Sequence, residues 1–294
     1  MGVQFPVGPN GKVSTSHFGK IIFSRSIREL DPELSRNIQQ EKQWRRQYHK
    51  FMPGYQATCS GSVNISEQVS EQSLQDCHEL FRFHRDGRDM PLSQAMSTLD
   101  KQYFYRAEIK GDKSFNESIR VKYGNDFVST QGLKYLIKRW IDEGIVELSH
   151  GNDVTHVLNH TDLLDLRGKK FVVLGGTSEV GPLTTLLALG ANVVAVSRPN
   201  SKKWQSLIEL ARNTCGTLIF PCDLNPVGLS DEELSLTAGA DLLSQTPELA
   251  YWLNQLEGEF TLGCYAYLDG SKHVKVVMAM DAIAQYLLEK RNDV

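Results

Sequence analysis

The amino-acid sequence predicts an α/β protein, in which a parallel sheet of about four strands follows a mostly helical N-terminal region. From about residue 168 onward, short apolar runs alternate with segments of helical character, the pattern of consecutive strand–helix–strand units. The first of these runs, over residues 171–174, is continuously apolar, as expected of a strand buried on both faces. Residues 1–165 are polar and mixed instead. We therefore expect two domains, a mainly helical accessory domain over 1–165 and a sheet domain over 166–294.

The composition is that of an ordinary globular protein, with 40% hydrophobic and 23% charged residues. A formal net charge of −3 argues against nucleic acid as a partner, because nucleic-acid-binding domains are usually clearly basic. One local basic run consists of Lys42, Arg45, Arg46, His49 and Lys50. We interpret this run as a solvated helix face; the alternative is a contact with phosphate or with a protein partner.

The cysteines and the apolar segments indicate the cellular compartment of the protein. The five cysteines show no CxxC pair and no zinc-ligand spacing, which predicts a reducing compartment and no metal site. The N-terminal residues lack the apolar core of a signal peptide. No apolar run reaches the roughly 18–20 residues that a membrane span needs. We expect a cytoplasmic protein without a membrane partner, and the sequence leaves homo-oligomerisation open.

Hydrophobic periodicity predicts several helices in the N-terminal region. The clearest covers residues 129–143, where Leu133, Leu136 and Ile137 begin an apolar stripe at helical spacing. Apolar residues on both sides of Gly151 predict a short hairpin after this helix. Such a pair fits either part of a winged-helix module or a small docking domain. The other expectations are a loop or strand over 1–28, helices over 30–48, 72–84 and 92–105, and a loop over 57–70.

A glycine turn follows the apolar run over 171–174 and precedes a helix. Gly175 and Gly176 end the strand, and Gly181 lets the next helix lie close to it. The free N–H groups at the start of that helix would face a diphosphate. This arrangement predicts a dinucleotide site of Rossmann type, although Ser178 replaces the middle glycine; the alternative is a turn that only packs. The candidate cofactor-binding residues of the turn are Gly175, Gly176, Thr177, Ser178, Val180 and Gly181.

The end of the next strand, over residues 192–197, carries a basic residue. Ser197 ends this strand and Arg198 follows it. A site for NAD usually has Asp or Glu there to bind the ribose hydroxyls, whereas a guanidinium suits the 2′-phosphate of NADP. Ser197 and Arg198 are therefore candidate cofactor-binding residues that favour NADP, with NAD as the second choice. The alternative is that Arg198 is only an exposed loop charge.

The stretch from Lys169 to Asn225 resembles the nucleotide-binding half of short-chain dehydrogenase/reductase-like Rossmann proteins. The glycine turn, Arg198 and Asp223 follow three successive predicted strands in the order of that family. The resemblance covers about a fifth of the chain. It implies a parallel Rossmann-type sheet, NAD(P) as cofactor, and binding of the adenine amino group by Asp223 with Leu224 beside it. The chain also resembles uncharacterised two-domain proteins that contain such a half.

The chain departs from this family beyond the third strand. The family's catalytic Tyr-x-x-x-Lys has a match in Tyr286–Lys290, but this match falls on an expected helix over 273–291, and we interpret it as chance. An insertion over 226–259 contains an expected helix with Thr246 as its N-cap, which either packs or forms a lid. A sheet of this kind would add a strand after residue 294. We therefore expect either a reduced sheet or a truncated part of a longer product.

Polar residues stand at the carboxyl end of the predicted fourth strand, at Tyr265, Tyr267 and Asp269. Ligands of open α/β sheets bind at this edge. Tyrosine can donate a proton, and aspartate can act as an acid or base, so these three are the candidate catalytic residues. The alternative is that the tyrosines only pack.

Together these features predict an NADP(H)-binding Rossmann protein that acts as an oxidoreductase on an unknown small-molecule substrate, by hydride transfer. The alternative is a non-catalytic Rossmann module that senses a nucleotide or serves as a scaffold.

Overall fold

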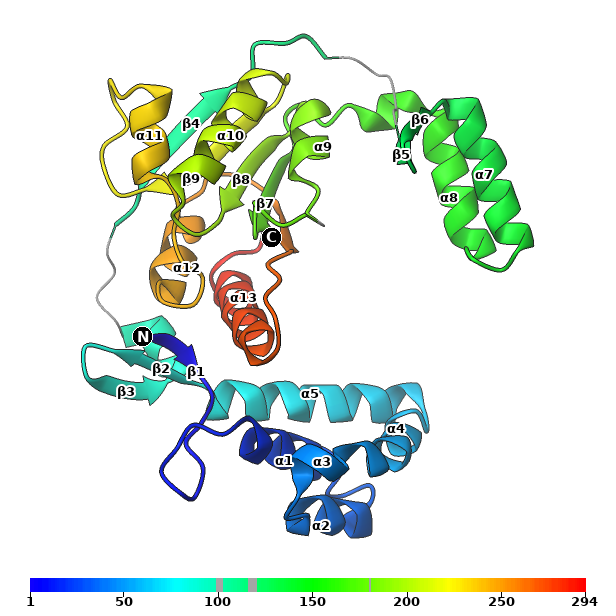
Figure 1. Cartoon of the computed structure of the whole chain (residues 1–294), viewed down its shortest axis with the longest axis vertical. Helices are drawn as coiled ribbons and strands as arrows, with labels where there is room; N and C mark the ends of the chain where they lie inside the picture. The colour runs from blue at the N-terminus through cyan, green and yellow to red at the C-terminus, as the bar shows by residue number, and fades with distance from the viewer. Residues whose placement is uncertain (99–102, 116–120, 180) are drawn as a thin grey trace.

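The computed structural model describes residues 1–98, 103–115, 121–179 and 181–294, and its main feature is a five-stranded sheet (Figure 1). Its strands are β4 (Tyr105–Lys110), β7 (Lys170–Leu174), β8 (Asn192–Val196), β9 (Thr217–Cys222) and β10 (Thr261–Cys264). In space the order is β10-β7-β8-β9-β4. All neighbours are parallel except β4, which lies antiparallel to β9. The predicted α/β class and the mostly parallel sheet are therefore confirmed.

The edge strand β4 was not expected from the sequence pattern. Residues 92–105 are expected to form one helix, but helix α6 (Leu92–Thr98) ends early and β4 begins at Tyr105. In β4, the buried residues Ala107 and Ile109 alternate with exposed ones. An alternation this short does not distinguish a strand from a helical turn. A strand from before the expected boundary at residue 165 thus completes the sheet.

Helices cover both faces of the sheet. α9 (Leu183–Ala188) and α10 (Ser201–Arg212) pack on one face, and α11 (Asp231–Thr237) packs on α10. α12 (Thr246–Asn254) and α13 (Ser271–Lys290) pack on the other face. The strand residues alternate between the two layers, since Val173 and Ala195 face α9 and α10 whereas Val172 and Val194 face α12 and α13. The apolar strands are thus buried on both sides, as predicted for the run over 171–174.

Two further expectations concern α12 and α13. The helix expected over 273–291 is α13, and the Tyr286–Lys290 match lies on it, with Tyr286 packed against the core. The expectation that Thr246 is an N-cap is wrong. Gln245 occupies the cap position, and the Thr246 hydroxyl instead donates to Leu242 O (2.6 Å).

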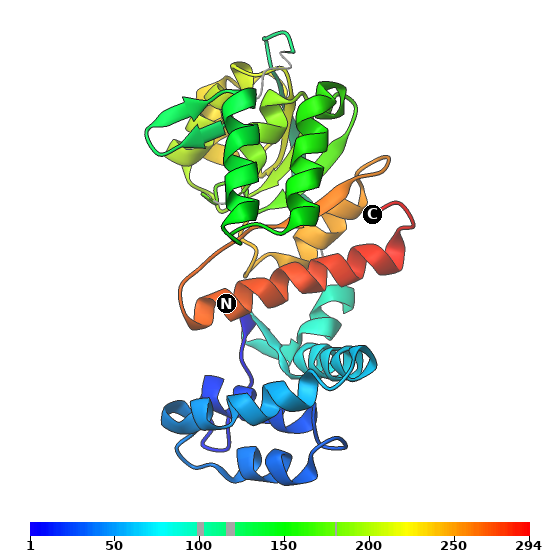
Figure 2. The same cartoon turned by 90° about the vertical axis from the view of Figure 1, so that its right-hand side faces the viewer.

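The first 98 residues form a small antiparallel sheet and a layer of helices. The sheet has the order β1-β2-β3, with β1 (Gly2–Gln4), β2 (Arg82–Arg85) and β3 (Arg88–Pro91). The helices besides α6 are α1 (Thr15–Arg25), α2 (Pro32–Gln40), α3 (Trp44–Gln47), the 3-10 helix η1 (Tyr48–Lys50), α4 (Met52–Cys59) and α5 (Val63–Leu80). Figures 1 and 2 both show α13 lying between this part and the large sheet.

Several of the elements expected in the N-terminal region differ from those in the structure, because serine N-caps start helices there. The segment expected to be a loop or strand over 1–28 contains strand β1 but also helix α1. The loop expected over 57–70 contains the end of α4 and the start of α5. Ser14 and Ser62 begin α1 and α5, because each hydroxyl accepts a hydrogen bond from the backbone N–H three residues on. The helix expected over 30–48 is divided into α2 and α3. The helix expected over 72–84 is part of α5 as far as Leu80, but residues 82–84 belong to strand β2. Within the described ranges, every helix is too short or too polar to serve as a membrane span.

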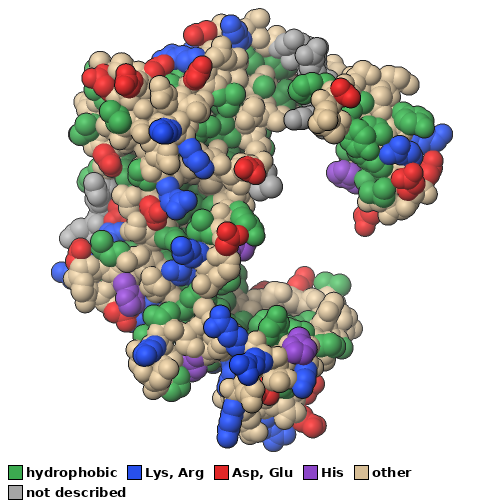
Figure 3. Space-filling model, viewed as in Figure 1, with side chains coloured by type: hydrophobic (Ala, Val, Ile, Leu, Met, Phe, Trp, Pro, Cys, Tyr) green, Lys and Arg blue, Asp and Glu red, His purple; other side chains and the backbone are tan. Residues whose placement is uncertain are grey.

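Residues 121–164 form an arm that stands apart from the rest of the molecule on the face shown in Figure 3. Its elements are β5 (Val121–Tyr123), β6 (Asp126–Val128), α7 (Thr130–Asp142), α8 (Leu148–Asn159) and the 3-10 helix η2 (Thr161–Leu164). α7 confirms the helix predicted over 129–143. The hairpin predicted around Gly151 is wrong, because Gly151 lies inside α8, and the winged-helix alternative loses its hairpin. A Cβ there would stand 2.3 Å from Ile141 Cδ1, so this glycine lets α8 approach α7.

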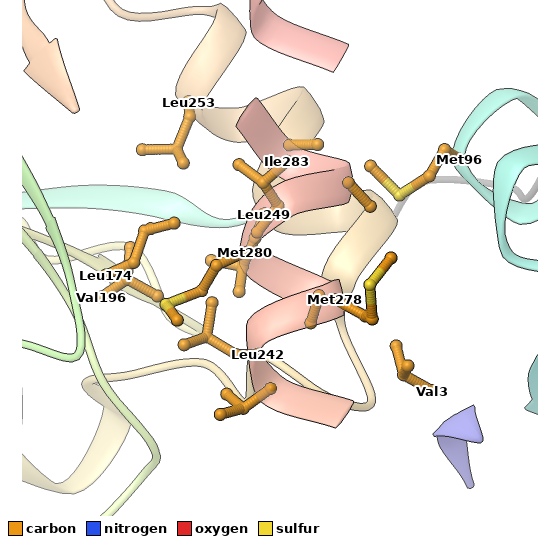
Figure 4. Packing of buried hydrophobic residues seen from close by; sticks show 14 of the residues in the cluster. Val3, Met96, Leu174, Val196, Leu242, Leu249, Leu253, Met278, Met280 and Ile283 are labelled. Carbon is orange, nitrogen blue, oxygen red and sulfur yellow. The ribbon is translucent and has the colours of Figure 1, made fainter. Parts of the chain in front are cut away.

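One hydrophobic core joins the N-terminal region to the large sheet. Helix α13 contributes side chains in two directions (Figure 4). Met280 points toward Leu174 of the sheet, whereas Met278 points toward Val3 and Met96. All these side chains are buried. Residues before and after position 165 therefore contribute to one shared core, while a smaller cluster of Ile27, Ile38, Trp44 and Val69 lies within the N-terminal region alone.

A buried ion pair adds to this junction. Glu248 of α12 is 2% exposed, and both of its carboxylate oxygens accept hydrogen bonds from the guanidinium of Arg85 in β2. The same guanidinium donates to Ser244 O. Nearby, Val3 N donates to Leu243 O (2.8 Å). The first strands of the chain are thus hydrogen bonded to the segment that enters α12.

Burial raises the pKa of the Cys77 and Cys222 thiols to about 11, and neighbouring carboxylates add to this effect. Because the thiolate is the nucleophile, we expect both to react with iodoacetamide about a hundredfold more slowly than an unperturbed thiol at about pH 8. Timed labelling followed by peptide mass spectrometry measures these rates, with N-acetylcysteine as the reference thiol. The difference should vanish in denaturant. Rates equal to that of N-acetylcysteine in the native protein would contradict the assignment.

Candidate functional site

A cavity of about 160 Å³ lies at the carboxyl edge of the large sheet. Five segments line it: the glycine turn after β7, the end of β8 with the start of α10, the loop before α12, the residues after β10, and α13 through Val276. The strand order reverses at this place, because β8 lies on one side of β7 and β10 on the other. The helices after β7 and β10 also cover opposite faces. Open α/β sheets bind ligands at such a point.

The glycines of the turn are explained by close packing. Gly175 has φ +101°, and a Cβ on it would stand 2.4 Å from Ala266 N in the segment after β10. A Cβ on Gly176 would stand 2.9 Å from Ala195 Cβ. A Cβ on Gly181 would meet only atoms of the turn itself. Gly176 therefore lets the turn lie close to the neighbouring strand β8, whereas the nearest atoms to a Cβ on Gly181, which was expected to let the next helix approach β7, belong to the turn itself.

Backbone N–H groups of the turn are used within the protein. Gly175 N and Gly176 N both donate to Val196 O (2.8 and 3.0 Å), and Ser178 N donates to Gly175 O (2.8 Å). The following helix α9 has only six residues. These three amides of the turn are therefore not free to bind a diphosphate. Val180 lies outside the described residues.

Hydroxyl groups and cations face the cavity instead. Ser197 at the end of β8 is buried, and its Oγ lies 2.6 Å from Thr177 Oγ1 of the turn. Arg198 and Lys203 line the cavity beside this pair, and neither forms an ion pair with any residue that the structure describes. Trp204 Nε1 donates to Arg198 O (3.2 Å), which fixes the backbone there. Two cations beside hydroxyls suit an anion such as phosphate.

The loop before α12 lies across the ends of β8 and β9. Gly239 N donates to a carbonyl of β9, and Ala240 N donates to Ser197 O, both at 2.8 Å. Asp223 and Leu224 follow β9 but do not line the cavity, and Leu224 is 57% exposed. The structure therefore does not bring these two candidates together with the glycine turn.

Of the three candidate catalytic residues, only Tyr267 lines the cavity. Its ring is 65% exposed and lies 4.8 Å, between centroids, from the ring of His273 at the start of α13. Tyr265 continues the sheet, since its backbone N–H donates to Leu174 O (2.8 Å). Its side chain packs against the buried residues on the α9 and α10 side of the sheet. Asp269 is exposed and outside the cavity lining. The packing alternative thus describes Tyr265, whereas Tyr267 is free to meet a ligand.

No family model, curated protein or solved structure matches this chain. The assignment of the candidate site therefore rests on the geometry of this structure alone.

Sequence reasoning did not single out two charged residues of the cavity. Asn200 Oδ1 accepts from Lys203 N (3.2 Å), so Asn200 is the N-cap that starts α10 with Lys203 in its first turn. Asp241 Oδ1 accepts from Leu243 N and Ser244 N (2.8 and 2.9 Å), which folds the loop before α12. The N-cap Asn200 and the turn residue Asp241 are local signals in the sequence, and they could have indicated the positions of Lys203 and of the loop before α12.

Proposed function

We propose that the protein binds NADP(H) at this cavity and is an oxidoreductase whose small-molecule substrate is not identified. The observation that carries the proposal is that Arg198 and Lys203 line the same cavity as Thr177 and Ser178 of the glycine turn, at the point where the strand order reverses. A phosphate ester of a dinucleotide is the anion that such a position favours.

The strand order supports a Rossmann-type assignment. Along the chain the parallel strands are β7, β8, β9 and β10, and in space they lie as β9-β8-β7-β10. This is the 3-2-1-4 order of the first four strands of the dinucleotide-binding fold. Helices on both faces of the sheet agree with that assignment.

The lining residues suit the parts of NADP(H) in sequence. Arg198 and Lys203 would hold the 2′-phosphate, the hydroxyls of Thr177 and Ser178 would meet the diphosphate, and the nicotinamide would lie toward Tyr267. The cavity is below the range of about 300–1,000 Å³ usual for ligand pockets, so part of the cofactor would lie along the open edge. Bound nicotinamide supplies hydride transfer. Tyr267 would then hold a proton at its hydroxyl for the reacting group.

Replacing Arg198 with Asp should reverse the preference between the two cofactors. We expect affinity for NADPH to fall by about tenfold to a hundredfold, the magnitude of a lost charge-assisted hydrogen bond, while that for NADH stays equal or rises. Isothermal titration of both cofactors measures the ratio. Lys202→Asp is the matched control, since it makes the same change of charge one helical position before Lys203 but outside the cavity lining. Unchanged relative affinities in Arg198→Asp would exclude the 2′-phosphate contact.

The non-catalytic alternative has a different outcome. A nucleotide sensor would bind NADPH but show no oxidation of it with any panel of aldehydes and ketones. Absence of binding by either cofactor would leave a scaffold as the function of the sheet.

A further inference from the structure

A second, larger groove of about 530 Å³ lies in the N-terminal region, far along the chain from the cavity at the sheet edge. Two segments supply its charged residues: the start of α1, with His17 and Lys20, and residues 41–46. Pro9 also lines it. Figure 3 shows Lys and Arg side chains gathered over the part of the molecule where Figure 1 places α1 to α3. Three residues of the basic run noted in the sequence, Lys42, Arg45 and Arg46, therefore share this groove with His17 and Lys20 of α1.

The charges that line this groove are almost all positive. Lys20 comes from α1, and Lys42, Arg45 and Arg46 come from the second segment. Within the described ranges, none of these four forms an ion pair. The single carboxylate of the lining, Glu41, accepts a hydrogen bond from the backbone of residue 43. Cations gathered without counter-charges repel one another, and a bound anion relieves that repulsion.

The groove is held in shape by packing beneath it. Trp44 is 7% exposed, and its ring packs between Phe23 and Phe51. Gly19 of α1 makes room for it, since a Cβ there would stand 3.2 Å from Trp44 Nε1. Lys20 Nζ donates to Glu41 O (3.0 Å), which ties the two segments together. The buried indole thus fixes the backbone on which the neighbouring cations stand.

The positive charge of the chain is concentrated in the region that contains the groove. Residues 1–50 contain nine Lys and Arg against four Asp and Glu, a net charge of +5, whereas residues 51–294 carry 23 against 31, a net charge of −8. The first turn of α1, which borders the groove, contains no acidic residue, so the positive end of its dipole is not neutralised there. An otherwise acidic protein thus keeps one strongly basic concave surface.

We propose that this groove binds a soluble ligand that carries several phosphate groups, independently of the cofactor site. Guanidinium and ammonium groups from two segments can each take a different phosphate oxygen. The volume lies within the range of about 300–1,000 Å³ that encloses small ligands. A small oligophosphate therefore fits the concave shape better than a nucleic acid, which needs an extended basic surface.

Inorganic triphosphate is the probe, titrated calorimetrically into the full chain, with sulfate at equal ionic strength as the comparison. We expect triphosphate to bind more tightly than sulfate and to weaken as salt is added, because salt screens exposed charges. The double variant Lys42→Gln/Arg45→Gln should lose about tenfold or more in affinity. Arg36→Gln/Lys50→Gln removes the same charge from the same region outside the groove lining, and should change affinity by less than about twofold.

Three results would overturn the proposal. The first is that the titration shows no binding heat at triphosphate concentrations up to about 1 mM, which corresponds to weak binding. Another is an equal loss in both double variants, which would mean a general charge effect. The third is much tighter binding of a single-stranded RNA, lost in the groove variant, which would assign the groove to nucleic acid. The Arg198→Asp variant should bind triphosphate as the unmodified chain does, so the two sites can fail separately.

Discussion

Replacing Gly175 with alanine is expected to lower the free energy of unfolding by about 3 kcal/mol or more, the sum of backbone strain and overpacking. Gly175 has φ +101°, and the added methyl group would stand 2.4 Å from the backbone nitrogen of Ala266. The backbone of Ala266 belongs to the segment after β10, so it cannot move aside as a flexible side chain would. The added methyl group should therefore push apart the ends of β7 and β10, where the cavity lies.

A second glycine isolates the steric part of this effect. Gly228 has φ +82°, but a Cβ there would meet nothing within 4 Å. Gly228→Ala should cost only the backbone strain of about 1–2 kcal/mol. Urea unfolding followed by circular dichroism gives both values. Equal losses in the two variants would show that the contact between Gly175 and Ala266 carries no stability.

Replacing Arg85 with methionine should be at least as damaging, at about 3–5 kcal/mol, because it leaves the carboxylate of Glu248 buried without its partner. Glu248 is 2% exposed, and Arg85 supplies hydrogen bonds to both of its oxygens. Loss of the pair should weaken the junction between β2 and α12. The measurement is again the free energy of unfolding from urea titration.

The double variant Arg85→Met/Glu248→Leu tests the reason for that loss. It removes both charges, so it should recover most of the stability that Arg85→Met loses. An exposed pair gives the matched control: Arg106 and Glu108 on β4 lie 2.9 Å apart with about half of each side chain exposed, and Arg106→Met should cost no more than about 1 kcal/mol. A double variant as unstable as Arg85→Met would mean that packing, and not the unpaired charge, sets the cost.

The sequence predicted those elements whose pattern is repeated over many residues. The buried strand over 171–174 and the helices α7 and α13 are confirmed, because continuous apolar runs and long helical stripes record their burial locally. Elements whose pattern is short were missed. β4 has two buried positions, and α8 contains a glycine that resembles a turn signal until Ile141 is seen against it.

The same distinction applies to the candidate site. Thr177, Ser178, Ser197, Arg198 and Tyr267 are brought to one cavity, because parallel strands place their carboxyl ends at a common edge. Asp223 stands at the same edge, yet it is outside the lining since the loop before α12 crosses between β8 and β9. The course of that insertion depends on contacts with distant residues, which no local pattern records.

The pairing of β4 with β9 has a consequence for synthesis of the chain. Tyr105 and its partner Cys222 are separated by 117 residues. At typical ribosomal rates, the nascent chain carries β4 without its partner for on the order of ten seconds. During that interval the apolar side chains of Ala107 and Ile109 are not covered by β9 and can contact other proteins. Assembly of this sheet in the cell thus depends on keeping one short segment from premature association until translation has passed β9.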